Sequence, residues 1–280
     1  MSFLPLTPGG QTPPRVMTIA GSDSGGGAGI QADMRTFALL GVHACVAVTA
    51  VTVQNSMGVR GFHEIPVDVI TGQIEAVASD IGIQAAKTGM LASSAIISAI
   101  ADTWRSQGLA GTVPLVVDPV CASMHGDPLL HPSAVDSLRD ELFPLATLVT
   151  PNLDEVRLLV GIHVVDDSSQ REAARALHAL GPQWALVKGG HLRSSPESPD
   201  LLYNGTDFYE FGATRIDTAD DHGAGDTLAA ATASALAQGY PLTDAIAFAK
   251  SWVTECLRAA YPLGHGHGPV SPLFRLSQTP

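Results

Sequence analysis

From Val16 onward, the sequence alternates short runs of β-branched residues with longer segments rich in alanine and leucine. Short apolar runs of this kind are typical of buried strands, and the longer segments are typical of helices. A strand, a helix and a second strand in succession favour parallel pairing of the two strands. The pattern therefore predicts an α/β fold, with a central, mostly parallel sheet and helices on both of its faces. In such a sheet, ligands bind outside the carboxyl ends of the strands.

The same pattern gives the approximate position of each element. The predicted strands cover residues 16–20, 44–53, 84–87, 113–117, 148–150 and 185–188, and a hairpin is predicted over 201–203 and 207–211. The predicted helices cover residues 28–40, 67–79, 93–107, 132–142, 152–160, 170–180, 224–238 and 242–260. Because no repeat or linker divides the chain, we expect one domain over residues 16–280, preceded by a disordered leader over residues 1–15.

Charge and cysteine content narrow the class of protein. The formal net charge of −12 argues against a nucleic-acid partner, because a phosphate backbone would be repelled. Cys45, Cys121 and Cys256 are odd in number and widely spaced, which fits reduced thiols in the cytoplasm. Residues 1–15 lack the features of a signal peptide, and the longest apolar run is too short to span a membrane. We therefore expect a cytoplasmic enzyme that has no membrane partner.

A glycine-rich loop over residues 21–29 follows the first predicted strand. It contains a formal G-x-G-x-x-A match to the dinucleotide fingerprint, which needs an acidic residue about twenty positions later. No acidic residue occurs between Asp33 and Glu64, so a nicotinamide oxidoreductase is disfavoured. Dense glycine costs folding entropy, which favours a loop that closely approaches a ligand over a simple turn. Asp33 either faces the same cavity or only complements the dipole of the following helix.

A second glycine-containing segment, TADDHGAGDTL over residues 218–228, precedes an alanine-rich helix. Gly223 and Gly225 allow backbone N–H groups at the start of the helix to point together toward an anion. Asp226 lies at the same helix end, where it could accept a proton from an attacking hydroxyl. The alternative is that Asp226 merely caps the helix.

The chain resembles the hydroxymethylpyrimidine and phosphomethylpyrimidine kinases of thiamine synthesis, which belong to the ribokinase superfamily. In that superfamily, the segment GAGD over residues 223–226 corresponds to an anion-hole motif whose Asp is the catalytic base. The resemblance runs from about Val16 to Val270. Its markers are AGSDSGGGAGIQAD (residues 20–33), VQNS (53–56), KTGML (87–91), DPV (118–120), GDPLL (126–130), TPNLDE (150–155), KGGH (188–191) and GHGHGPV (264–270).

This resemblance implies a ribokinase-like three-layer fold, a pyrimidine acceptor, and ATP with Mg²⁺ as cofactors. Catalysis is assigned to Asp226 with Gly223, Ala224 and Gly225. The implied acceptor-binding residues are Gly21, Ala28, Asp33, Gln54, Met90 and Val120. Lys188, Asn152 and Thr227 are assigned to ATP and its phosphates, and Asp118 and Glu155 to magnesium, through water. These roles require the glycine loop and the start of the helix at residue 224 to border one cavity.

Several of these residues also have an ordinary structural interpretation. Asn152 could be a helix cap and Glu155 a solvated acid of the first turn, Met90 could fill the core, and Lys188 could be a surface lysine. The GHGHG segment has two histidines without further ligands nearby, so no metal is assigned to it. The resemblance places this segment near the nucleotide base.

The resemblance predicts phosphorylation of 4-amino-5-hydroxymethyl-2-methylpyrimidine, followed by phosphorylation of its monophosphate. Family members often carry Cys where Asp226 stands, whereas pyridoxal and sugar kinases of the superfamily carry Asp. Residues 121–125 also depart from the usual small and hydroxyl-bearing residues. Pyridoxal kinase is therefore the alternative within the same class, and a non-catalytic pyrimidine-binding protein is the alternative outside it. Members of the family are commonly homodimers, and the sequence itself identifies no interface.

Overall fold

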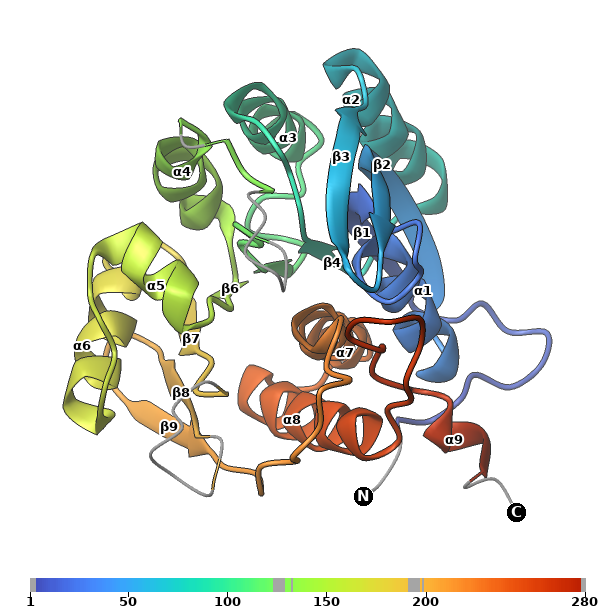
Figure 1. Cartoon of the computed structure of the whole chain (residues 1–280). Coiled ribbons are helices and arrows are strands. Elements are labelled where there is room, and N and C mark those ends of the chain that lie inside the picture. Colours follow the sequence, from blue (N-terminus) through green and yellow to red (C-terminus); the bar gives the residue numbers. More distant parts are fainter. Residues whose placement is uncertain (1–3, 123–128, 132, 191–196, 198, 278–280) are drawn as a thin grey trace.

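The computed structural model describes residues 4–122, 129–131, 133–190, 197 and 199–277. In this part of the chain, the strands form one sheet in the order β3-β2-β1-β4-β5-β6-β7-β8-β9 (Figure 1). The strands are β1 (Arg15–Ser22), β2 (His43–Asn55), β3 (Gly58–Glu64), β4 (Ala85–Thr88), β5 (Leu115–Val117), β6 (Leu148–Val149), β7 (Trp184–Val187), β8 (Asp200–Tyr203) and β9 (Phe208–Phe211). Neighbours from β2 to β7 pair in parallel, and only β3, β8 and β9 pair antiparallel. The predicted mostly parallel sheet is confirmed.

Helices cover both faces of this sheet and complete the three predicted layers (Figure 1). They are α1 (Gly29–Leu39), α2 (Val67–Ala76), α3 (Ser94–Ser106), α4 (Ala134–Ser137), α5 (Leu153–Val160), α6 (Asp167–His178), α7 (Ala224–Ala237), α8 (Leu242–Arg258) and α9 (Phe274–Ser277). The π turns η1 (Val77–Ile81) and η2 (Leu138–Leu142) extend α2 and α4, and the 3₁₀ turn η3 (Phe143–Leu145) follows η2.

Two buried clusters lie on opposite sides of the sheet. Met17 and Ile19 of β1 belong to the cluster that α2 to α6 cover, which includes the fully buried Trp104. Val16 belongs to the other cluster, which lies under α1, α7 and α8 and includes the fully buried Trp252. This division follows from strand geometry, because successive side chains point to opposite faces. Both sides of the central strands are therefore apolar, as expected for a parallel sheet.

The structure differs from the sequence prediction in several places. The strand predicted over 44–53 is longer, and it turns into β3, which was not predicted, to form a hairpin. The helix predicted over 132–142 is instead α4 followed by η2 and η3, and Pro132 lies outside the described residues. The leader expected over residues 1–15 supplies the first residue of β1 and the buried side chain of Leu4. The division into leader and domain stays a prediction.

Consecutive parallel strands bring polar residues to one edge of the sheet. Asp118 directly follows β5, Thr150 follows β6 and Lys188 follows β7. The glycine loop follows β1 on the same edge. This is the edge at which α/β sheets bind ligands. No helix in the described part of the chain is long and apolar enough to cross a membrane.

Candidate active site

The glycine loop and the start of α7 lie in direct contact. Gly223, the N-cap of α7, has φ +80°, and a Cβ on it would lie 2.1 Å from the carbonyl oxygen of Gly27. A Cβ on Gly27 would in turn lie 2.3 Å from Cδ2 of His222. Only glycine allows two backbones to approach this closely. The structure therefore brings together the two segments to which the sequence analysis assigned the acceptor and the base.

Asp23 holds the glycine loop in shape. Its carboxylate accepts hydrogen bonds from the backbone N–H groups of Gly25 at 2.8 Å and of Gly27 and Ala28 at 2.9 Å. One of its oxygens also lies 2.9 Å from Nε2 of His222. Burial raises the pKa of Asp23, but the hydrogen bonds and charge of His222 and the loop amides outweigh burial, so the pKa is lowered. The Ala28 amide is thus bonded to Asp23.

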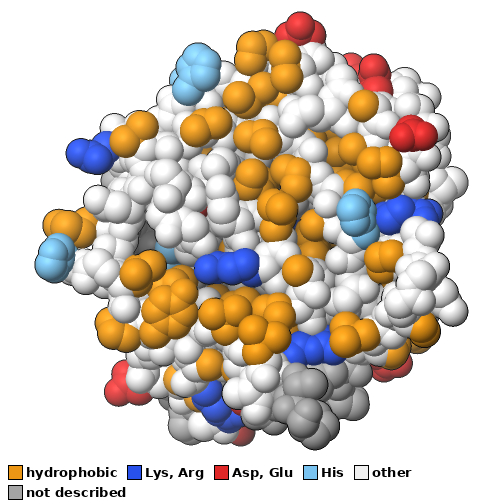
Figure 2. All heavy atoms as spheres, turned by 90° about the vertical axis from the view of Figure 1, so that its right-hand side faces the viewer, with side chains coloured by type: hydrophobic (Ala, Val, Ile, Leu, Met, Phe, Trp, Pro, Cys, Tyr) orange, Lys and Arg blue, Asp and Glu red, His pale blue; other side chains and the backbone are white. Residues whose placement is uncertain are grey.

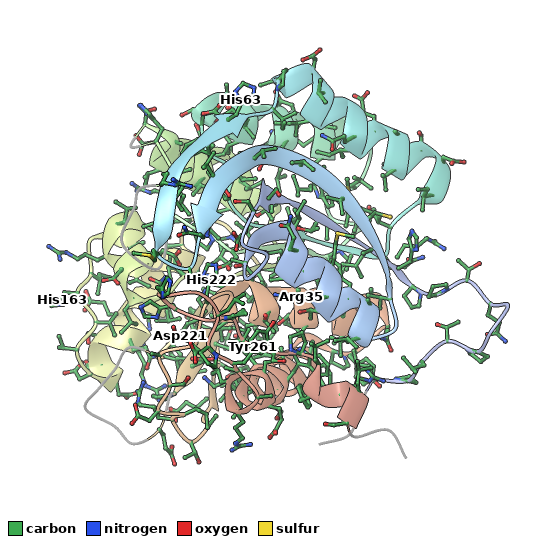
Figure 3. The ribbon with its side chains drawn as sticks, turned by 45° about the vertical axis from the view of Figure 1, so that its right-hand side comes forward. Arg35, His63, His163, Asp221, His222 and Tyr261 are labelled. Carbon is green, nitrogen blue, oxygen red and sulfur yellow. The ribbon has the colours of Figure 1, made fainter. Side chains whose placement is uncertain are left out.

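Neither Asp23 nor His222 was assigned a role from the sequence. An aspartate two residues before a glycine can fold back onto its own backbone, and this signal could have found Asp23. His222 gave no comparable signal, because its partner is 199 positions away. Gln54, which was assigned to the acceptor, also reaches this place, since its Nε2 lies 3.5 Å from Nε2 of His222. Figure 3 shows His222 beneath the β2–β3 hairpin.

Lys87 of β4 joins two of the predicted site residues in a buried ionic cluster. Its Nζ lies 2.9 and 3.0 Å from the two carboxylate oxygens of Asp33 and 2.8 Å from Oδ1 of Asp226. Thr18, which lies beside Lys87 in the β1–β4 register, donates to Asp33 at 2.6 Å. The side chains of Lys87 and Asp33 are fully buried, and that of Asp226 is 14% exposed. Asp33 therefore contacts lysine and threonine here, which differs from the ring contact expected for it.

The three charges of this cluster shift one another's pKa values. Burial raises the pKa of Asp33 to about 7, although the positive charge of Lys87 acts against this shift. Burial also raises the pKa of Asp226, but the charge and hydrogen bond of Lys87 outweigh burial and hold that pKa below its usual value. The two carboxylates in turn overcome the desolvation of Lys87 and raise its pKa. Lys87 stays protonated, and Asp226 is ionised at neutral pH.

A second ion pair lies on the other side of the α7 N-terminus. Nζ of Lys188 lies 2.9 Å from Oδ1 of Asp118, which also accepts a hydrogen bond from Thr150 at 3.1 Å. A Cβ on Gly225 would lie 3.3 Å from Nζ of Lys188 and 3.5 Å from Oδ2 of Asp118. Burial lowers the pKa of Lys188, but Asp118 and Glu155 outweigh burial and raise it. A cation and the first-turn amides of α7 thus lie side by side, which is an arrangement suited to phosphate oxygens.

Asn152 and Glu155 form a complete capping box at the start of α5. Glu155 N–H donates to Oδ1 of Asn152 at 2.9 Å, and Asn152 N–H donates to Oε2 of Glu155 at 2.8 Å. Glu155 is only 6% exposed, so it is not the solvated acid of the structural interpretation. Burial, reinforced by the charge of Asp118, raises its pKa to about 7 against the effect of Lys188.

These carboxylates suit magnesium only in part. In the described residues, no group of three or more His, Cys, Asp or Glu side chains could hold a metal ion. Mg²⁺ does not need such a cage, because it keeps several waters and binds one or two carboxylates together with substrate phosphates. Asp118 fits that chemistry, since its Oδ2 faces Gly225 at the predicted phosphate end. Both oxygens of Glu155 already accept backbone hydrogen bonds, from Asn152 and Cys121, so this residue fits only contact through water.

The remaining predicted residues border the same region. Sδ of Met90 would lie 3.1 Å from a Cβ on Gly21, so these two residues are neighbours, and Met90 is buried. Val120 has φ +36°, a conformation that is rare for a β-branched residue and that concentrates at functional sites. Thr227 is buried, and its amide donates to the Gly223 carbonyl, so it acts within α7 in this structure.

The GHGHG segment contacts the tip of the β2–β3 hairpin. The amides of His265 and Gly266 donate to Oγ of Ser56, and the amide of His267 donates to the Ser56 carbonyl. Gly268 then bonds through its carbonyl to the amide of His222. The segment therefore ties the hairpin to the residue that precedes the α7 N-cap. Residues 123–125, in the loop whose sequence departs from the family pattern, lie outside the described residues, as does His191 of the KGGH motif.

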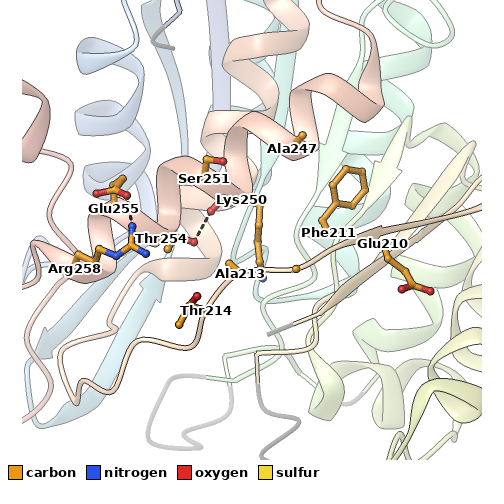
Figure 4. A pocket seen from close by; sticks show the side chains of 11 residues that line it. Glu210, Phe211, Ala213, Thr214, Ala247, Lys250, Ser251, Thr254, Glu255 and Arg258 are labelled. Carbon is orange, nitrogen blue, oxygen red and sulfur yellow. Dashed lines mark hydrogen bonds and ion pairs between the residues drawn. The ribbon is translucent and has the colours of Figure 1, made fainter. Parts of the chain in front are cut away.

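A separate cavity of about 540 Å³ lies between α8 and the segment that follows β9 (Figure 4). It is lined by Glu210, Phe211, Gly212, Ala213, Thr214, Ala247, Lys250, Ser251, Thr254, Glu255 and Arg258. Lys250 donates to Asp200 at 2.8 Å, and Asp200 accepts from the amide of Gly189 at 2.9 Å. Gly189 directly follows Lys188, so the cavity adjoins the Lys188–Asp118 pair through these contacts. No sequence motif pointed to it.

Comparison with known proteins agrees with this geometry. The family model for phosphomethylpyrimidine kinase matches residues 23–271. A hydroxymethylpyrimidine/phosphomethylpyrimidine kinase from Mycobacterium tuberculosis is 74% identical over 277 residues, covering 99% of this chain and 100% of that protein. A thiamine biosynthesis bifunctional protein from Geobacter sulfurreducens is 48% identical over 91% of this chain and 51% of its own length. The solved structure of an ADP complex of Bacillus subtilis pyridoxal kinase has a TM-score of 0.86 at 34% identity, covering 96% of this chain and 100% of that one.

Proposed function

The chain belongs to the phosphomethylpyrimidine kinase family, and from this premise we propose how its residues carry out the reaction. It is a phosphotransferase of thiamine biosynthesis that acts on hydroxymethylpyrimidine and on phosphomethylpyrimidine. The donor in this proposal is ATP. The hydroxymethyl oxygen forms a bond to the γ-phosphorus, the bond from that phosphorus to the β,γ-bridging oxygen breaks, and ADP leaves.

Asp226 receives the proton of the hydroxymethyl group in this proposal. The observation that supports this role best is its place in the first turn of α7, ion-paired to Lys87, partly exposed, and next to the contact between Gly223 and Gly27. A lowered pKa suits the role, because a carboxylate must be ionised to accept a proton. Phosphoryl transfer has a loose transition state, so positioning and electrostatics matter more than a strong base.

The glycine loop and its neighbours bind the pyrimidine. The proposed acceptor contacts are Gly21, Ala28, Gln54, Met90 and Val120. Gln54 offers a donor and an acceptor to the aminopyrimidine edge, and Met90 offers an adaptable apolar wall. Asp33 contributes to this site through Lys87, because its own oxygens are occupied by Lys87 and Thr18.

The proposed phosphate contacts are Lys188, Asn152, Thr227 and the amides of Gly223 and Gly225. The amide of Ala224, which the resemblance also assigned to the anion hole, donates instead to the Asp221 carbonyl at 3.1 Å. Mg²⁺ would be held by Asp118 and, through water, by Glu155, and when bound it would neutralise phosphate charge. The adenosine part of ATP is proposed to occupy the cavity beside Phe211 and Ala247, since that cavity adjoins Lys188 through Lys250. This replaces the expected place beside the GHGHG segment, which contacts Ser56 at the hairpin tip.

We further propose that the chain is a homodimer formed through the β2–β3 hairpin and that it is cytoplasmic. Val51, Val53 and Met57 are exposed large apolar side chains on this hairpin, and β3 is an edge strand of the sheet. Figure 2 shows apolar side chains spread over the side of the molecule that lies on the right in Figure 1. Exposed apolar side chains next to an edge strand favour contact with a second copy. The three free cysteines, all buried, support a reducing compartment.

Release of ADP from ATP, measured with each ring as acceptor, tests the proposal. We expect kcat/KM for the hydroxymethylpyrimidine to exceed that for pyridoxal by at least tenfold, and we expect inorganic phosphate not to form without acceptor. The resemblance to the B. subtilis pyridoxal kinase structure makes pyridoxal the matched comparison. A higher kcat/KM for pyridoxal would show that pyridoxal, and not the pyrimidine, is the preferred acceptor. Absence of ADP release with either ring would refute the proposed reaction.

A further inference from the structure

Lys87 is the only described residue that contacts both Asp33 and Asp226 by hydrogen bonds. We propose that Lys87 is a positioning residue for transfer to the hydroxymethyl group, and that Asp33 is the counter-charge that allows Asp226 to take up a proton beside a buried lysine. This inference rests on the proposed role of Asp226 as base. It assigns Asp33 a part in the reaction without contact to the substrate.

The geometry fixes the orientation of Asp226. Lys87 lies inside β4, and its whole side chain is buried between the sheet and the helices that carry the two carboxylates. Two of its contacts go to Asp33, at 2.9 and 3.0 Å, and one goes to Oδ1 of Asp226, at 2.8 Å. Because the Lys87 ammonium is fully buried and needs charged partners, it keeps its contact with Oδ1 of Asp226. Oδ2 is then the oxygen of Asp226 that accepts the proton of the acceptor.

The need for Asp33 follows from the charge of the cluster during the reaction. Burial and the negative charge of Asp226 together raise the pKa of Asp33 to about 7 against the effect of Lys87. When Asp226 takes the proton, its negative charge no longer disfavours ionisation of Asp33, so Lys87 keeps an ionised Asp33 as its partner. Without Asp33, protonation of Asp226 would leave a buried lysine unpaired, which is a strongly unfavourable state. Asp33 therefore lowers the cost of the protonated base, which is the state the reaction must pass through.

Other charged groups also face this cluster. His222 and Lys188 act on Asp226, and Asp118 acts on Lys87. His222 lies before α7, Lys188 lies after β7, and Asp118 lies after β5. Among the described residues, none of the three forms a hydrogen bond with Asp33. His222 and Lys188 face Asp226 in the native chain and in both variants, so they do not mimic the effects predicted below.

The test is the pH dependence of kcat for the hydroxymethylpyrimidine in two variants that change opposite charges. The acid limb is the pH range over which kcat falls as the pH is lowered. Asp33→Asn removes the group whose pKa is about 7, so the acid limb should move to lower pH, where Asp226 titrates, and the plateau of kcat should fall at least tenfold. Lys87→Met removes the positive charge, so the acid limb should move to higher pH. We expect each limb to move by about one pH unit or more, with KM for the pyrimidine changed less than threefold.

Two further variants serve as controls. Lys87→Arg keeps the charge and should keep the native position of the acid limb, even if its kcat is lower. Ile100→Val removes one buried methylene from the cluster that α2 to α6 cover, and it should lower the melting temperature without moving the limb. If Lys87→Met does not fold, the direction of the Asp33→Asn limb decides the matter.

A purely structural role for the cluster predicts a different result. It would lower the melting temperature of Asp33→Asn but leave its acid limb at the native pH, and that outcome would overturn the proposal. A shift of both limbs in the same direction would also overturn it. Neither result would contradict the proposed reaction itself. That reaction is tested separately, by ADP release from the native chain with the pyrimidine as acceptor.

Discussion

The imidazole of His222 lies 2.9 Å from the carboxylate of Asp23, and this contact joins the glycine loop to the residue that precedes the N-cap of α7. Asp23 also binds three amides of its own loop. One shared carboxylate therefore holds together the proposed acceptor side and the proposed catalytic side of the site. A displacement of either segment would change the distance between the acceptor hydroxyl and Asp226, and transfer rates are sensitive to such displacements.

Replacing Asp226 by Ala should affect the two transfers differently. The hydroxymethyl group must lose a proton, whereas the monophosphate already carries ionised oxygens at neutral pH. We expect kcat for the first transfer to fall by about 10² to 10⁴, and kcat for the second transfer to fall much less. The measurement is ADP release with each acceptor, together with a thermal melt.

Asp244 provides the matched control for Asp226. It is the third residue of α8, as Asp226 is of α7, but it is exposed. If Asp226 only complemented the helix dipole, Asp226→Ala and Asp244→Ala would cost similar stability, on the order of 0.3–1 kcal/mol, and leave kcat unchanged. Equal and small effects of the two substitutions would therefore contradict the role of base.

Gly223→Ala should separate the glycine loop from α7. The added Cβ would lie 2.1 Å from the Gly27 carbonyl oxygen, in a backbone with φ +80°. Gly239→Ala is the control, because Gly239 has φ +84° and nothing within 4 Å of an added Cβ. The control should cost about 1–2 kcal/mol from backbone strain alone. Gly223→Ala should cost more and lower kcat/KM for the pyrimidine at least tenfold. If denaturant unfolding and kinetics give equal values for both variants, the contact does not matter.

Glu155→Gln should change how stability depends on pH. The pKa of Glu155 is raised to about 7 in the folded protein, above its ordinary value of 4.5. The folded state therefore binds the extra proton between these values, and native stability falls as pH rises through this window. A Gln keeps the capping box but carries no charge. The melting temperature of the variant relative to native should thus rise from pH 5 to pH 8. Asp154→Asn, at the exposed neighbouring position, should show no such trend.

Val53→Asp should weaken the proposed homodimer. Val53 is 53% exposed on β2, and a charge on an apolar contact face opposes association. Sedimentation velocity should show a larger monomer fraction for this variant than for the native chain. Val165→Asp adds the same charge at a site that is 58% exposed between α5 and α6, and it should leave the native distribution unchanged. A monomeric native chain would contradict the dimer directly.

Local features of the site could be read from the sequence because short-range physics decides them. Strand and helix periodicity predicted the parallel sheet, and strand ends predicted the edge that carries Asp118 and Lys188. Asn152 and Glu155 are three residues apart, so their capping box depends only on helix geometry. The GAGD segment likewise predicted the α7 N-terminus, because the start of a helix depends on residues that are close in the sequence.

The pairings between distant residues were decided by the tertiary structure alone. Lys87 is 54 positions from Asp33 and 139 from Asp226. The family resemblance placed Asp33 at the ring, and nothing in the sequence indicated the lysine as its partner. The sequence specifies which residues are charged, but the register of β1 with β4 and the docking of α1 and α7 on the sheet decide which charges meet. Burial then forces each buried charge to have a partner, because water no longer solvates it. For this reason the pairing of Asp33 with Lys87 became known only from the fold.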